Sequence, residues 1–134
     1  MVSPLARKKS STLTEAELRI MDVLWEKGRA SVKDVTEALA TGEQPLAYNT
    51  VLTMLRILHQ KKYANYLKEG RAFIYEPLVG KEQARQNVVS YLLNRFFDNS
   101  PSLLVQNLLD SEAVDASELE QLKQRIEDHG EVGQ

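Results

Sequence analysis

The sequence predicts a mainly α-helical protein with a small β-hairpin wing, in which a winged helix-turn-helix head precedes a helical dimerisation tail. Three observations support this fold class. The segment from Leu46 to Lys62 has one apolar and one polar face at helical spacing. Two short aromatic and β-branched runs follow it directly, as in a β-hairpin. After Pro77 the chain changes to leucine-rich helical segments, which indicates a second, helical region.

The first two helices of the head are marked by their start and stop residues. Thr14 and Glu17 form the pattern of a capping box, and Gly28 is suited to end the helix that they begin. Ser31 is expected to cap a second helix. The side chains expected to face the core are Leu18, Met21, Leu24, Trp25, Val32, Val35 and Leu39. The turn over residues 41–45 is longer than in the tightest helix-turn-helix units, a length that winged-helix variants tolerate.

The third helix of the head gives the strongest functional signal. Its apolar stripe, at i, i+3, i+4 and i+7, consists of Val51, Met54, Leu55 and Leu58. Its opposite face has no acidic side chain and carries Asn49, Thr53, Arg56 and Gln60. A helix that combines a core face with such a polar face is typical of a DNA recognition helix.

The segment from Tyr63 to Tyr75 is predicted to form a β-hairpin, with its turn near Gly70. Lys68 and Arg71 lie near the tip of this hairpin. A hairpin directly after a recognition helix is the wing of a winged-helix domain, and basic residues at its tip can contact phosphate. The helix and the hairpin therefore predict the same DNA-binding head.

Three further helices are predicted after Pro77. The first spans Lys81 to Phe97. The second has Ser100 as its cap and Pro101 at its first position, and the third starts at Asp115. Their apolar surfaces are broader than a small head can cover, so these surfaces need a further partner.

We therefore predict a homodimer built on residues 80–128. The side chains expected at its interface are Val88, Tyr91, Leu92, Phe96, Leu104, Leu108, Leu119, Leu122 and Ile126. The alternative is that these helices fold back on their own head. The predicted domains are a basic flexible arm over residues 1–12, the winged-helix head over 13–79, and the dimerisation domain over 80–134, frayed from residue 129 onward.

The distribution of charge separates the two regions. The chain has a net charge of −2 at pH 7. Residues 1–81 contain 13 Lys and Arg against 9 Asp and Glu, whereas residues 82–134 contain 4 against 10. A positive head suits contact with DNA phosphate, and an acidic tail suits contact with a protein partner. Chance clustering of charges is the alternative.

The composition argues against several function classes. The chain has no cysteine, which excludes disulfides, thiolate metal sites and cysteine nucleophiles. His59 and His129 are its only histidines and it has no glycine-rich phosphate loop, so we predict no enzyme, metal site or cofactor. We recognise no signal peptide and no apolar run of membrane-spanning length, and expect a cytoplasmic protein without membrane insertion.

Three segments resemble the penicillinase-repressor family of bacterial transcriptional regulators, the BlaI/MecI/CopY type. They are LTEAELRIMDVLWEKG at residues 13–28, LAYNTVLTMLRILHQK at residues 46–61 and GRAFIY at residues 70–75. The resemblance covers the chain from Leu13 to Ile126. It implies a homodimeric winged-helix repressor that binds an inverted-repeat DNA operator, in many members that of β-lactam resistance genes.

The resemblance also implies a mode of release. Many members are cut within the carboxy-terminal domain, after an asparagine, when a sensor protease acts upstream. The matching bond joins Asn107 to Leu108, although the best-known members have phenylalanine where this chain has Leu108. Copper-responsive members carry a cysteine cluster that this chain lacks, which excludes copper sensing by that chemistry.

The residues that contact DNA are predicted from this resemblance and from side-chain chemistry together. Asn49, Leu52 and Thr53 match the family's groove-facing positions, and asparagine can pair with adenine while leucine or threonine can contact a thymine methyl group. The alternatives are core packing for Leu52 and capping of the helix start for Asn49. Contacts to the DNA backbone are assigned to Tyr48, Thr50, Arg56, Lys61, Lys62, Lys68 and Arg71, with help from Arg7, Lys8 and Lys9 as an arm.

Two other functions stay open at this point. The exposed face of the third helix can bind a polypeptide instead of DNA, which would make the head a protein-interaction module. The second alternative is a regulator that a small ligand, bound in the dimer domain, releases from DNA.

Overall fold

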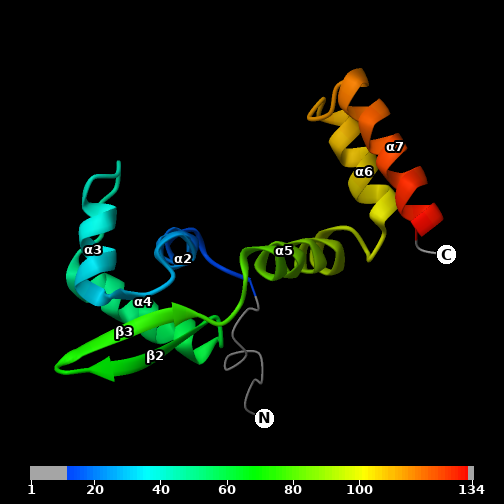
Figure 1. Cartoon of the computed structure of the whole chain (residues 1–134). Helices are drawn as coiled ribbons and strands as arrows, with labels where there is room; N and C mark the ends of the chain where they lie inside the picture. Colours follow the sequence, from blue (N-terminus) through cyan, green and yellow to red (C-terminus); the bar gives the residue numbers. More distant parts are fainter. Residues whose placement is uncertain (1–11, 133–134) are drawn as a thin grey trace, which may run out of the picture. The chain divides into compact units, whose positions relative to one another are not determined.

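The computed structural model describes residues 12–132 and contains helices α2 to α7 and one three-stranded antiparallel sheet. The chain divides into two compact units, of which the first ends at Tyr91 and the second begins at Leu92. The first unit contains α2 (Glu15–Lys27), β1 (Ala30–Ser31), α3 (Val32–Ala40), α4 (Tyr48–Gln60), β2 (Ala64–Glu69) and β3 (Ala72–Pro77) (Figure 1). This mainly helical architecture with a hairpin wing confirms the predicted fold class. Arg7, Lys8 and Lys9 lie outside the described residues.

The starts of α2 and α3 are held by the predicted side chains. The Thr14 hydroxyl accepts a hydrogen bond from the Glu17 amide at 3.2 Å, and the Glu17 carboxylate accepts one from the Thr14 amide at 2.9 Å. Ser31 and Asp34 form the same reciprocal pair at the start of α3. The hydrogen bonds from Ser31 lower the pKa of Asp34, which keeps a negative charge at this helix start.

The core of the head lies between α2, α3, α4 and the sheet. Its largest fully buried side chains are Ile20, Met21, Val35, Leu24, Val51, Leu55 and Leu58. The predicted stripes of α3 and α4 are confirmed, with Met54 only half-buried. The prediction for Leu18 is wrong, because Leu18 is 37% exposed and Glu17 and Ile20 occupy the buried side of α2 instead.

The sheet contains one strand more than the predicted hairpin. β2 and β3 pair in an antiparallel register with Tyr66 opposite Tyr75, and β1 pairs with the other edge of β3 through Ala30 opposite Tyr75. The hairpin turn includes Gly70, whose φ of +62° is a left-handed conformation that glycine adopts without strain. The wing is therefore tied to the start of α3 as well as to the end of α4.

The head extends beyond its predicted end at residue 79. Helix α5 spans Lys81–Phe96, and the first compact unit includes this helix as far as Tyr91. Ala84 is 5% exposed and belongs to the core of the head. The Asn87 carboxamide donates a hydrogen bond to the Tyr63 hydroxyl at 3.0 Å. The start of α5 is thus a structural part of the winged helix.

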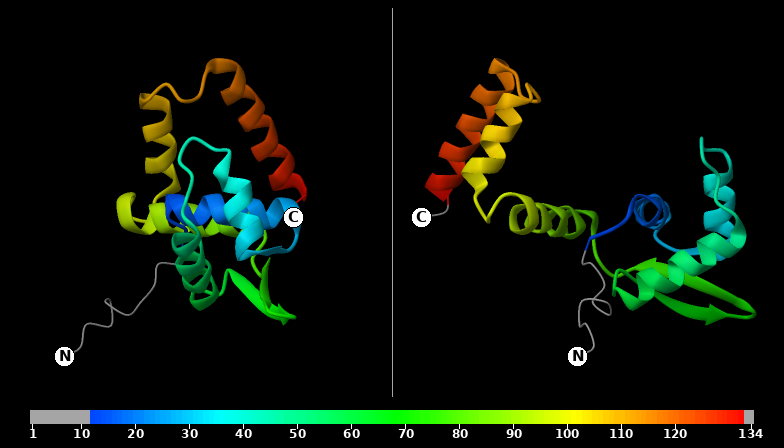
Figure 2. Two further views of the ribbon diagram at one scale, coloured as in Figure 1. Left: turned by 90° about the vertical axis from the view of Figure 1, so that its left-hand side faces the viewer. Right: turned by 180° about the vertical axis from the view of Figure 1, so that it is seen from behind.

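The second unit contains the end of α5 and the helices α6 (Pro101–Asp110) and α7 (Ala116–Val132). Ser100 and Asp115 cap α6 and α7 as predicted. The two helices form a V that opens away from their connecting turn (Figure 2). No residue of α6 is buried, and every described side chain of α7 is exposed. Helix α7 continues through residues 129–132, where the sequence predicted a frayed end.

Within residues 12–132, none of the helices combines the length and the apolar composition that a bilayer span requires.

Candidate nucleic-acid interface

The exposed face of α4 carries two of the three side chains predicted to read bases. Asn49 and Thr53 are both exposed and lie about one helical turn apart. Ala47 is the N-cap of α4, and no side chain caps this helix. The alternative role for Asn49 as the helix cap is therefore wrong, and its carboxamide is available for a base edge.

Leu52 occupies the boundary between this exposed face and the core. It is half-buried and packs against the core cluster, so the alternative reading of Leu52 as a core residue is correct in part. Its remaining surface faces a groove beside α4. At the start of the helix, Tyr48 is 51% exposed and Thr50 is half-buried.

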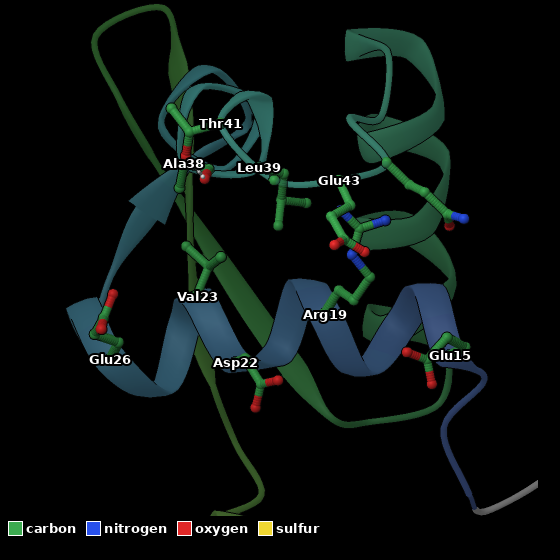
Figure 3. A pocket seen from close by; sticks show the side chains of 11 residues that line it. Glu15, Arg19, Asp22, Val23, Glu26, Ala38, Leu39, Thr41 and Glu43 are labelled. Atoms are coloured by element: carbon green, nitrogen blue, oxygen red, sulfur yellow. Dashed lines mark hydrogen bonds between the residues drawn. The ribbon is translucent and has the colours of Figure 1, made fainter.

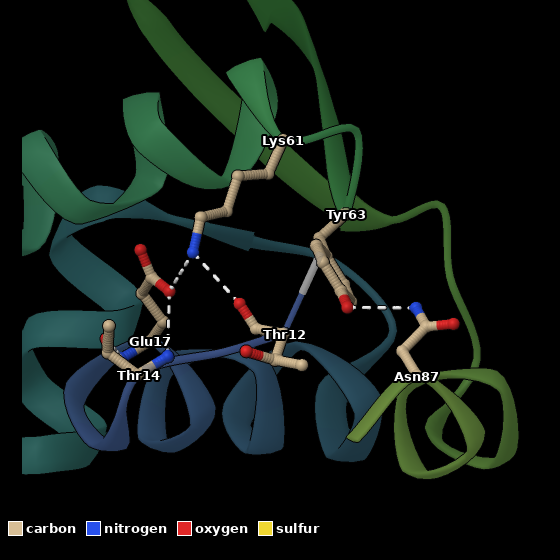
Figure 4. A network of polar contacts seen from close by, with 6 residues as sticks. All are labelled: Thr12, Thr14, Glu17, Lys61, Tyr63 and Asn87. Carbon is tan, nitrogen blue, oxygen red and sulfur yellow. Dashed lines mark hydrogen bonds and ion pairs between the residues drawn. The ribbon is translucent and has the colours of Figure 1, made fainter. Parts of the chain in front are cut away.

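Lys61 does not belong to the DNA-facing surface, which corrects one predicted backbone contact. Its side chain is only 6% exposed, and its ammonium lies 2.7 Å from the Glu17 carboxylate. It also donates a hydrogen bond to the Thr12 carbonyl at 3.0 Å (Figure 4). An ammonium held in this way cannot reach phosphate, and it instead joins the end of α4 to the start of α2.

The other predicted cations remain exposed. Lys62 lies two residues after the end of α4, and Arg71 lies in the hairpin turn. The Lys68 ammonium lies 5.9 Å from the centre of the Phe73 ring, on the hairpin. Arg56 projects from the exposed side of α4. These four side chains are distributed along the helix and the wing, so they can contact phosphates at separate positions.

A groove of about 270 Å³ lies between α4 and the hairpin. Its lining consists of Leu52, Arg56, His59, Gln60, Tyr66, Phe73 and Tyr75. Tyr66 is the centre of an aromatic cluster, with its ring centroid 4.8 Å from that of His59 and 5.3 Å from that of Phe73. Burial raises the pKa of Tyr75, which keeps its phenol neutral at physiological pH.

Reasoning from the sequence did not assign His59, Tyr66 or Phe73 to this surface. The alternation of side chains along a strand was the available signal, because it places Tyr66 and Lys68 on the same face of the hairpin. The register then places Phe73 opposite Lys68 on that face.

A second hollow, of about 570 Å³, lies between α2 and the turn after α3, away from the residues predicted to contact DNA. Its acidic lining residues are Glu15, Asp22, Glu26 and Glu43. Figure 3 shows Arg19, the basic residue of the lining, pointing from α2 toward Glu43. Since the acidic side chains outnumber it, this hollow repels phosphate and does not extend the candidate interface.

Comparison with known proteins identifies the family. Residues 13–128 match the family described as penicillinase repressor. The chain belongs to the penicillinase repressor family. It is 30% identical to the penicillinase repressor of Bacillus licheniformis, over 91% of this chain and 94% of that protein. It is 23% identical to the methicillin resistance regulatory protein MecI of Mammaliicoccus sciuri, over 86% and 93% of the two chains.

A solved structure of this family supports the fold of the head. The solution structure of the DNA binding domain of the repressor BlaI has a TM-score of 0.50 and 32% identity, and the match covers 57% of this chain and 92% of that domain. The penicillinase repressor family consists of transcriptional repressors. The chain is accordingly a winged-helix transcriptional repressor and not an enzyme.

The chain also exposes, or leaves half-buried, the apolar side chains predicted for a dimer interface. Phe96 is 67% exposed and Ile126 is 70% exposed, values that are unusual for large apolar residues. The others are exposed or half-buried: Val88, Tyr91, Leu92, Leu104, Leu108, Leu119 and Leu122. Asn107 and Leu108, the residues of the predicted cleavage site, are exposed on α6.

Proposed function

We propose that this repressor binds an inverted-repeat DNA operator in the cytoplasm, through α4 and the wing. The observation that carries the proposal is the exposed face of α4, where Asn49, Thr53 and Arg56 lie in a helix that contains no acidic residue. The likeness of the head to the DNA binding domain of the repressor BlaI supports the same reading. Bound across a promoter, such a head blocks transcription.

Within this surface we assign base reading to Asn49, Leu52 and Thr53, and backbone contacts to the remaining exposed side chains. Those side chains are Tyr48, Thr50, Arg56, Lys62, Lys68 and Arg71. Base contacts set sequence preference, whereas phosphate contacts add affinity for any sequence.

The two classes of residue are expected to respond differently to substitution. Thr53→Ala should relax preference at one base position by about 1–3 kcal/mol. Arg71→Ala should weaken binding to all duplexes alike and reduce the slope of log affinity against log salt by about 1. Fluorescence anisotropy across salt, with a selected and a shuffled duplex, measures both. Identical effects of the two variants on both duplexes would contradict the assignment.

We propose that the repressor acts as a homodimer through its second unit and the adjoining part of α5. Helices α6 and α7 bury no described side chain and are splayed apart, so a single chain gives them no core. Leucine side chains on both helices, among them Leu108 and Leu122, would lose contact with water in a dimer. A symmetric dimer also presents two heads to an inverted repeat.

Release by a sensor protease is proposed at the bond between Asn107 and Leu108. Both residues are exposed, but they lie inside α6, and the Asn107 carbonyl accepts a hydrogen bond from the Ser111 amide at 3.0 Å. A protease needs an extended segment, so α6 must open locally before cleavage. A helix with no buried residue opens at low cost.

Co-expression with the sensor protease of a penicillinase repressor system tests this site. We expect one cut after Asn107, seen by intact-mass spectrometry. Asn107→Ala should slow the cut roughly tenfold or more, because the residue that precedes the cut is the one recognised, whereas Gln106→Ala should leave the rate unchanged. A cut at another bond, or equal cleavage rates for both variants, would show that the protease does not recognise Asn107.

A further inference from the structure

The groove between α4 and the hairpin has an apolar floor and polar edges. Half-exposed aromatic rings form the hairpin side, with Tyr66 39% and Phe73 41% exposed. The helix contributes Arg56, His59 and Gln60, each of which is exposed and can donate hydrogen bonds. The groove can therefore hold a molecule that has both an apolar and an anionic part.

Arg56 is the one charged side chain among the described residues that line this groove. Lys68 shares the hairpin face that carries the aromatic rings, and its ammonium lies over Phe73. The acidic residues of the hairpin, Glu69 and Glu76, are on the opposite face. There the Arg29 guanidinium lies 2.5 Å from the Glu69 carboxylate and 3.9 Å from that of Glu76.

The groove is continuous with the surface that we propose for base reading. Leu52 and Arg56 line the groove, and both belong to the outward part of α4 next to Thr53. A DNA strand that is read by α4 in the major groove, and touched by the wing farther along, has to cross the space between these two elements. The groove occupies that space.

We propose that this groove binds one deoxyribose-phosphate unit of the operator backbone. Arg56 pairs with the phosphate, and the rings of Tyr66 and Phe73 pack against the sugar, which is the apolar part of the unit. His59 holds the Tyr66 ring in place through their edge-to-face contact. This proposal rests on the proposed DNA-binding function and adds aromatic residues of the wing to its binding surface.

The test compares a ring deletion, a charge deletion and a matched control on one duplex, which the unmutated chain selects from a random-sequence library. Tyr66→Ala and Phe73→Ala should each weaken binding about threefold to tenfold and leave the salt slope unchanged, because no charge is lost. Arg56→Ala should weaken binding and reduce the slope by about 1. Leu67→Ala, on the other face of β2, should change neither quantity.

A neutral methylphosphonate placed at each position of the duplex in turn locates the phosphate. At one position the substitution should abolish the effect of Arg56→Ala, since the two changes remove the same contact and cannot add. Tyr66→Phe, which keeps the ring, should bind as the unmutated chain does. Circular dichroism melting curves identify any variant that fails to fold. If the two ring deletions do not fold, the comparison of Arg56→Ala with each methylphosphonate still tests the site.

Two results together would overturn the groove site and leave the DNA-binding function intact. Tyr66→Ala and Phe73→Ala would bind DNA with unchanged affinity, and the loss of affinity caused by Arg56→Ala would add to the loss caused by the methylphosphonate at every position. Equal losses for Leu67→Ala and Tyr66→Ala would also overturn it, because the hairpin then acts as a whole. If the unmutated chain selects no sequence, both proposals fail, and a groove that binds a polypeptide becomes the better account.

Discussion

Lys61→Met is expected to lower the free energy of unfolding of this repressor by about 3–5 kcal/mol, because it leaves the buried Glu17 carboxylate without its cationic partner. The two side chains are 6% and 4% exposed, and their charged atoms are 2.7 Å apart. Chemical denaturation followed by circular dichroism measures the loss. In the folded fraction, the salt slope of DNA binding should stay unchanged, since the Lys61 ammonium makes no phosphate contact in this account.

Two further variants separate the ion pair from other effects. Lys62→Met removes the adjacent exposed cation and should change stability by less than about 0.5 kcal/mol. The double variant Glu17→Leu with Lys61→Met should recover part of the lost stability, because a buried pair can be replaced by apolar groups at small cost. The account would be contradicted if the Lys61→Met protein were as stable as the parent and its DNA binding had a reduced salt slope. Lys61 would then be a DNA contact.

The second large effect is expected on self-association. Ile126→Glu should weaken the homodimer roughly 10²-fold to 10⁴-fold, because burial of an isoleucine side chain contributes about 1.5–3 kcal/mol and a symmetric interface contains two copies. Ile126 is 70% exposed on α7 in the single chain, so the substitution has little to disturb within one subunit. Sedimentation equilibrium of the full chain measures the dissociation constant.

Gln121→Glu is the matched control, since it adds the same charge to an exposed position of α7. Its dissociation constant should stay within about threefold of the parent value. A monomeric parent protein at all concentrations would contradict the proposed dimer. A parent dimer that Ile126→Glu leaves intact would move the interface away from α7.

Local signals in the sequence predicted much of the head. The capping box of Thr14 and Glu17 and the cap at Ser31 depend on residues three positions apart, so they can be read without knowledge of the fold. The hairpin and the stripe of α4 were likewise visible as short periodic patterns. These elements were predicted because their determinants lie within the element itself.

The features that were missed depend on distant parts of the chain. Strand β1 exists because Ala30 pairs with Tyr75, and Lys61 is buried because Glu17 faces it across 44 residues of sequence. The buried side of α2 was predicted wrongly because it contains Glu17, and an acidic residue is not expected there. The predicted apolar stripe therefore included the exposed Leu18 instead. Tyr66 and Phe73 could not be assigned to the groove from the sequence, because the groove forms only where the hairpin lies beside α4.

The most direct test of sequence-specific repression is fluorescence anisotropy of the full chain on two duplexes across a range of salt. One duplex comes from upstream of its own gene or from selection, and the other is a shuffled duplex of equal composition. We expect a preference of at least about a thousandfold, with an affinity that falls steeply as salt rises. Absence of binding to either duplex at low salt would contradict the account and make a protein-interaction module the leading reading of α4.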